Sequence, residues 1–192
     1  SPCFISDISV NKCQMYLFFR HIGDRSDERW KRPVFQYFCL TKNRSHMNAL
    51  LAAHSGLRWI ALLLLIFTVF KAISGRMGKK SYLPLDKKLA TFTVMFFHIQ
   101  LVLGLILFFG NKWHTLMGEM KDTSIRFFTV EHSLGMLLAA VLLTIGSAKA
   151  KKASSDEKKY KTISWTFGIA LLIVLACIPW PFREIFASRG WF

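Results

Sequence analysis

The sequence has few acidic residues and lacks any closely paired cysteine motif. Its 192 residues include 11 Asp and Glu against 26 Lys and Arg, and only 19% of them are charged. The four cysteines form no CxxC pair and no CxxCH string. Their spacing therefore gives no support to a zinc ribbon, a thioredoxin-like motif or covalent attachment of a haem. Cys177 lies in an apolar stretch, where we expect it to pack as a small hydrophobic residue.

The basic residues are clustered between long apolar segments. Loops 71–88 and 149–161 carry six Lys and Arg each, whereas loop 110–126 carries three, together with two acidic residues. The basic loops hold few aromatic residues beyond Tyr82 and Tyr160, so base stacking is not indicated and we expect no nucleic-acid partner. Membrane proteins place such clusters on cytoplasmic loops. We therefore expect loops 71–88 and 149–161 to be cytoplasmic and both ends of the helical core to face outward.

Apolar residues make up 53% of the chain and fall into four long runs, at about 48–73, 89–109, 127–148 and 162–180. Each run has about 20 residues or more, which is enough for a helix to cross the hydrocarbon core of a bilayer. Lipid satisfies no backbone hydrogen bonds, so these runs must be helical. With short connections, the sequence predicts an all-α, integral membrane, antiparallel four-helix bundle in contact with membrane lipid. Pro179 and Pro181 are expected to end the fourth helix.

Residues 1–46 differ from the rest of the chain. They contain eight Lys and Arg, four Asp and Glu, three of the four cysteines, and no sustained helical period. So short a segment buries little core by itself. We interpret 1–46 as a basic N-terminal extension that is disordered or non-native. Residues 47–192 are then the transmembrane domain, with Met47 as its native start.

A few polar residues interrupt the predicted spans, and such residues are costly in lipid and usually functional. His54 is about six residues from the outer end of the first span and His132 about five from that of the third, so they are nearly level. His98 is about eleven residues, or roughly 16 Å, below the outer end of the second span. The first and third helices of a bundle are normally diagonal neighbours. His54 and His132 are therefore the best-matched pair.

Two level histidines on diagonal helices can hold a flat macrocycle between them, with the iron bound by one imidazole on each face. Arg58 lies one turn from His54 and can reach the propionates of a haem. Glu131 can orient an imidazole or pair with Arg58. The structural alternative is that each histidine only hydrogen-bonds across helices.

Small residues beside the histidines have two interpretations. Gly56 and Gly135 can leave room for a ring. Residues His132, Gly135, Ala139 and Gly146 also form a stripe at helical spacing, which is more often a face for helix packing than the wall of a cofactor site.

Five segments carry a resemblance to a known family: AHSGLRW (53–59), FFHIQLVLG (96–104), VEHSLGM (130–136), TIGSAKAKK (144–152) and IPWPF (178–182). In order and spacing they resemble small bacterial four-span inner-membrane proteins labelled cytochrome b-like. The resemblance covers about residues 47–182 and implies a haem b-binding bundle in the bacterial inner membrane that serves electron transfer. By this match His54, His98 and His132 are the family's histidines and Arg58 its arginine.

Together these observations predict one haem b per chain, ligated by His54 and His132. His98 is an alternative ligand, or a contact for a proton or a quinone. We expect electron transfer near the outer face with a redox partner or respiratory complex, and no stand-alone catalytic site. One alternative is a copper- or zinc-handling protein, since three imidazoles suit these metals. Another is a non-catalytic accessory subunit of a membrane complex.

Overall fold

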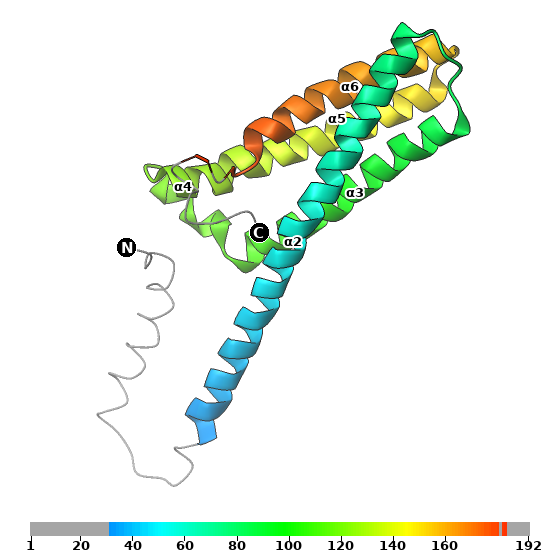
Figure 1. Ribbon diagram of the computed structural model, residues 1–192. Helices are drawn as coiled ribbons and strands as arrows, with labels where there is room; N and C mark the ends of the chain where they lie inside the picture. The colour runs from blue at the N-terminus through cyan, green and yellow to red at the C-terminus, as the bar shows by residue number, and fades with distance from the viewer. Residues whose placement is uncertain (1–30, 181, 184–192) are drawn as a thin grey trace. The chain divides into compact units, whose positions relative to one another are not determined.

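The computed structural model describes residues 31–180, 182 and 183, which form helices and no strand (Figure 1). Four helical stretches in this part of the chain are long and apolar enough to span a membrane. The first, His46–Met77, lies within α2 (Lys31–Met77), and the second is α3 (Pro84–Gly110). The third, Thr123–Lys152, includes α5 (His132–Lys152), and the fourth is α6 (Asp156–Cys177). The predicted all-α, four-span architecture is therefore confirmed.

Local signals explain where α3 and α6 begin. Pro84 opens α3, at a position where no backbone donor is needed. The carboxylate of Asp86 accepts a hydrogen bond from the N–H of Leu83 at 2.9 Å, which caps the helix. At the start of α6, Ser155 accepts from the N–H of Lys158 at 3.3 Å. Helix α6 ends at Cys177, just before the first of the predicted helix-ending prolines.

Helix α2 begins earlier than the sequence predicts. No helix was expected before residue 48, but α2 starts at Lys31 and continues through Met47. Pro33 lies in its first turn, where proline is tolerated. The chain divides into two units, Ser1–Asn43 and Arg44–Phe192, and the four membrane-spanning stretches lie in the second. Residues 1–30 of the predicted extension lie outside the described residues.

The connection between α3 and α5 is helical rather than an open loop. It contains the 3₁₀ segment η1 (Trp113–Glu119), the single-turn helix α4 (Thr123–Arg126) and the π-helical segment η2 (Phe127–Glu131). Asp122 caps α4 by accepting from the N–H of Ile125 at 3.0 Å. Segment η2 leads directly into His132, the first residue of α5. Single π-helical turns within a longer helix frequently occur at functional sites.

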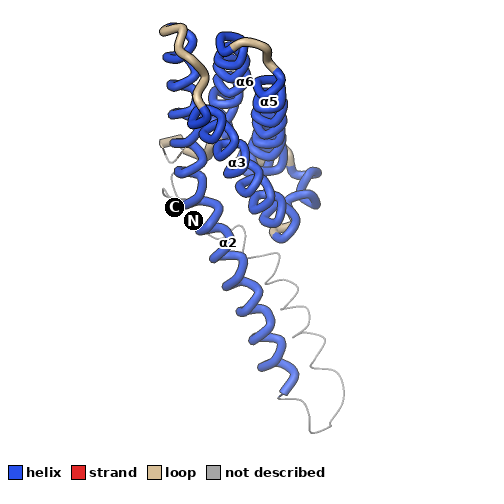
Figure 2. The backbone as a smooth tube through the Cα atoms, turned by 90° about the vertical axis from the view of Figure 1, so that its right-hand side faces the viewer, coloured by secondary structure: helices blue, strands red, loops and turns tan. Residues whose placement is uncertain are grey.

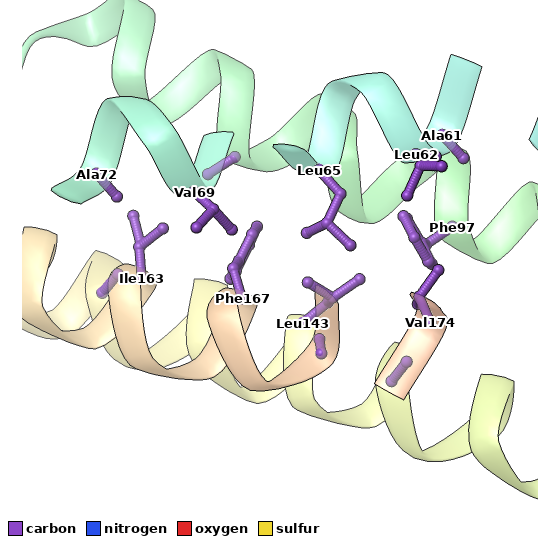
Figure 3. Close-up of a cluster of buried hydrophobic side chains, with 14 of the residues drawn as sticks. Ala61, Leu62, Leu65, Val69, Ala72, Phe97, Leu143, Ile163, Phe167 and Val174 are labelled. Carbon is purple, nitrogen blue, oxygen red and sulfur yellow. The ribbon is translucent and has the colours of Figure 1, made fainter. Parts of the chain in front are cut away.

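The helices pack in a ring in which α2 and α5 are diagonal. Helix α5 lies against both α3 and α6 (Figure 2). Helix α2 contacts α3 through a buried hydrogen bond between the hydroxyls of Thr68 and Thr93 at 2.7 Å. It also packs on α6, where Val69 points toward the fully buried Phe167 (Figure 3). The predicted diagonal placement of the first and third spans is thus observed.

The outer faces of the bundle are apolar. Leu63, Phe70 and Leu172 are 65–68% exposed. Within the most apolar window of each span, only 17–33% of the residues are buried. Helices that are hydrophobic on every side are typical of membrane spans. The fold is therefore that of a multi-pass membrane protein whose outer surface suits contact with lipid.

The glycines of α5 serve helix packing. A Cβ atom at Gly135 would overlap the thiol of Cys177, and one at Gly146 would overlap the hydroxyl of Thr166. Both positions therefore let α6 approach α5 closely. Gly56 faces open space. The expectation that Gly135 leaves room for a ring is wrong, because α6 fills the space beside it.

Candidate functional site

The imidazoles of His54 and His132 meet across the diagonal of the bundle. Their ring centroids are 6.3 Å apart and their planes make an angle of 77°. His54 belongs to α2 and His132 begins α5, so the site joins the two diagonal helices. The two side chains that the sequence analysis matched by depth therefore lie at one level.

The end of α6 fixes the orientation of His132. Its Nδ1 atom lies 2.8 Å from the carbonyl oxygen of Cys177, the last residue of α6. That carbonyl is available because α6 ends at Cys177, so no N–H one turn further along the helix donates to it. Since a carbonyl only accepts, Nδ1 must carry the proton and donate it. The lone pair of Nε2 is then left for a ligand.

Helix α3 supports His54 from the other side. The side-chain amide of Gln100 donates to the backbone carbonyl of His54 at 2.7 Å. One turn further along α3, a Cβ at Gly104 would lie 3.2 Å from Cε1 of His54, so only a glycine accommodates this ring without displacement. Nδ1 of His54 and Oε1 of Gln100 are both buried and have no hydrogen-bond partner among the described residues.

Aromatic side chains and the guanidinium of Arg58 lie around the pair. The rings of Phe127 and Phe128 lie 6.0 and 6.1 Å from that of His132. The guanidinium of Arg58 lies 4.9 Å from the ring of Trp59, and Arg58 is close enough to both imidazoles to act on them electrostatically.

The C-terminal side of the site continues this cluster. Trp59 contacts Trp180, whose ring stacks on Phe182 with centroids 5.5 Å apart. The guanidinium of Arg183 lies 5.4 Å from the ring of Phe127. Tryptophan is enriched at the interfaces of membranes. These contacts are therefore what we expect where the bundle meets the headgroup region.

His98 lies apart from this pair. Its Nδ1 atom is 2.8 Å from the carbonyl oxygen of Val94, and its Nε2 atom is 3.3 Å from the hydroxyl of Thr144 on α5. Gly104, which touches His54, is six residues further along α3, or about 9 Å along the helix axis. In the part of the chain that the structure describes, no group of three or more His, Cys, Asp or Glu side chains could hold a metal ion.

Glu131 has a different partner from the one expected. Its carboxylate pairs with Arg126 at 3.0 Å, and both side chains are almost half exposed. None of the ion pairs between described residues joins Glu131 to Arg58, which was one of the two roles considered for this carboxylate. The π-helical turn η2 separates Glu131 from Arg126 by five positions, which brings them together across a single wide turn.

Several features of the site were missed from the sequence. Gln100 and Gly104 are four residues apart and share a face of α3, so their spacing could have indicated that they act together. Nothing in the sequence pointed to Arg183, because it follows the last span and its position depends on how the chain folds back.

The separation of the two imidazole rings is compatible with a bis-imidazole haem. A metal ion bound by two imidazoles at about 2 Å from each nitrogen places the ring centroids about 6 Å apart, close to the separation here. The buried Nδ1 of His54, which has no hydrogen-bond partner among the described residues, is a further mark of a ligand site. The lack of a side chain at Gly104 gives the imidazole of His54 the room to lie there. A structural zinc ion takes four protein ligands, and a catalytic zinc ion takes three. The iron of a haem is already bound by four nitrogens of the macrocycle, so it needs only two ligands from the protein.

Comparisons of the chain with protein-family models, with curated proteins and with solved structures find no match.

Proposed function

We propose that this chain binds one haem b between His54 and His132 and serves electron transfer at that end of the bundle. The observation that carries the proposal is the pairing of these two imidazoles, at 6.3 Å, on diagonal membrane-spanning helices. Both histidines are half-buried, and ionisable residues on membrane-spanning helices are costly and usually functional. Among the described residues no third His, Cys, Asp or Glu joins these two ligands in a metal-binding group, which suits a haem better than copper or zinc.

Each neighbouring residue has a definite part in this proposal. Nε2 of His132 binds the iron because the carbonyl of Cys177 holds the proton on Nδ1. Gly104 and Gln100 hold His54 in register with it. When bound, a haem supplies one-electron redox chemistry. The guanidinium of Arg58 counters propionate charge, and the surrounding aromatic rings exclude water from the metal.

The decisive experiment is a reduced-minus-oxidised visible spectrum of the full chain purified in detergent. We expect the bands of a low-spin haem b in the wild-type protein and in His98→Ala. His54→Ala and His132→Ala should each lose them while keeping the helical signal in far-ultraviolet circular dichroism. His98→Ala is the matched control, because it removes a histidine from a span without touching the pair.

Two results overturn the proposal. One is loss of the spectrum in His98→Ala with retention in His54→Ala. The other is haem-free wild-type protein that binds copper or zinc in stoichiometric amounts. Added imidazole should restore the spectrum of His132→Ala, which distinguishes a lost ligand from a misfolded bundle.

We also propose that the haem end faces outward from a bacterial inner membrane, with loops 71–88 and 149–161 cytoplasmic. The support is the excess of lysine and arginine on these two loops. The haem then exchanges electrons with a quinone or a respiratory partner at the outer leaflet. Single cysteines in either loop should react with a membrane-impermeant maleimide only after the cells are broken open.

A further inference from the structure

A cavity of about 320 Å³ opens at the end of the bundle opposite the histidine pair. It lies between the start of α3, the end of α5 and the start of α6, where the two lysine-rich loops are attached. Three lysines line it, namely Lys87, Lys151 and Lys159, one from each helix. Ile163 and two alanines form an apolar part of its wall. The cavity thus combines positive charge with an apolar surface.

The positive charge at this cavity is only partly neutralised. Lys159 pairs with Asp156 at 2.8 Å. Lys87 and Lys151 belong to none of the ion pairs among the described residues. The nearby carboxylate of Asp86 is engaged elsewhere, because it pairs with Lys71 of α2 at 3.2 Å. Two lysines on different helices therefore remain to attract an anion.

Hydroxyl groups add hydrogen-bonding capacity. Tyr82 and the buried Ser147 both line the cavity. Burial, together with the negative charge of Asp86, raises the pKa of Tyr82 to about 12. The phenol therefore keeps its proton at neutral pH and can donate it to an anionic oxygen.

We propose that this cavity binds the phosphate headgroup of an anionic phospholipid. Basic pockets between helices at the lysine-rich side of a membrane protein suit such headgroups, and a volume of this size is typical of small-ligand sites. A lipid fits better than a free anion because Ile163 gives the cavity an apolar wall at the end of membrane-spanning helices. Acyl chains can continue from it along the exposed outer faces of these helices.

Native mass spectrometry of the full chain in detergent tests the proposal, with dioleoyl-phosphatidylglycerol, dioleoyl-phosphatidylcholine and inorganic phosphate as separate probes. The wild-type protein should bind phosphatidylglycerol more tightly than phosphatidylcholine. The double variant Lys87→Gln/Lys151→Gln should bind phosphatidylglycerol about 30-fold more weakly, from the usual contribution of each lysine near an anionic lipid. Its affinity for phosphatidylcholine should not change.

The matched control is Lys88→Gln/Lys152→Gln, which removes the same charge from the adjacent positions, neither of which lines the cavity. This control should retain the affinity of the wild type for phosphatidylglycerol. Equal weakening in both double variants, or no preference between the two lipids, overturns the proposal. Inorganic phosphate that binds as tightly as the lipid overturns the assignment to a lipid.

Discussion

A buried carboxylate ties three helices together at the lysine-rich end, and its strongest testable contact is with Tyr160. Asp86 of α3 is 5% exposed. Its Oδ2 atom accepts from the hydroxyl of Tyr160 on α6 at 2.8 Å, and Lys71 of α2 lies 3.2 Å from Oδ1. The Tyr160 hydroxyl also lies 3.1 Å from the carbonyl of Ser81. The hydroxyl of Tyr160 has one proton, so it donates one full hydrogen bond at a time. The carboxylate of Asp86 is charged and is therefore a stronger acceptor than the carbonyl of Ser81.

Tyr160→Phe removes this hydroxyl and leaves the buried ring in place. A hydrogen bond to a charged group contributes about 1.5–3 kcal/mol, so the free energy of unfolding should fall by about 2 kcal/mol. This corresponds to roughly a 30-fold change in the folding equilibrium constant. Equilibrium unfolding in mixed micelles with increasing sodium dodecyl sulfate, followed by circular dichroism at neutral pH, measures the change.

Tyr82→Phe is the matched control, because no hydrogen bond from its hydroxyl is observed among the described residues. Without added phospholipid it should change the free energy of unfolding by less than about 0.5 kcal/mol. In an Asp86→Asn background the cost of Tyr160→Phe should fall to about 1 kcal/mol, since the acceptor is then neutral. Equal losses in the two single variants would refute the reasoning.

Two further predictions concern glycines. Gly146→Ala should destabilise the bundle by about 1–3 kcal/mol, because the new methyl overlaps the hydroxyl of Thr166 and forces α5 and α6 apart; the same micelle titration measures it. Gly104→Ala should displace the imidazole of His54 by a few tenths of an ångström and reduce the haem retained after purification, measured from the visible spectrum.

Each of these has a glycine control on a neighbouring helix. At Gly168 of α6, a Cβ meets nothing within 4 Å, so Gly168→Ala should stabilise the helix by up to about 1 kcal/mol. Gly56→Ala adds a methyl in open space near the proposed haem site and should leave haem retention unchanged. An unchanged stability in Gly146→Ala, or equal retention of haem in Gly104→Ala and wild type, contradicts these predictions.

The sequence by itself determined the membrane architecture. Four apolar runs of spanning length must be helical, because the hydrocarbon core leaves backbone groups no other partners. Counting residues along those helices also placed His54 and His132 at one level, since the rise per residue of a helix is fixed. The start of α2 at Lys31 escaped this reasoning, because a polar segment gives no hydropathy signal for a helix.

The rotation of each helix about its axis was decided only by the tertiary structure. In a soluble protein the apolar stripe shows which face is buried, but a membrane-spanning helix is apolar on every side and carries no such signal. Rotation directs His98 toward Thr144 and away from the histidine pair, and it turns Gly135 and Gly146 toward α6. The carbonyl of Cys177 reaches His132 because packing aligns the end of one helix with the start of another.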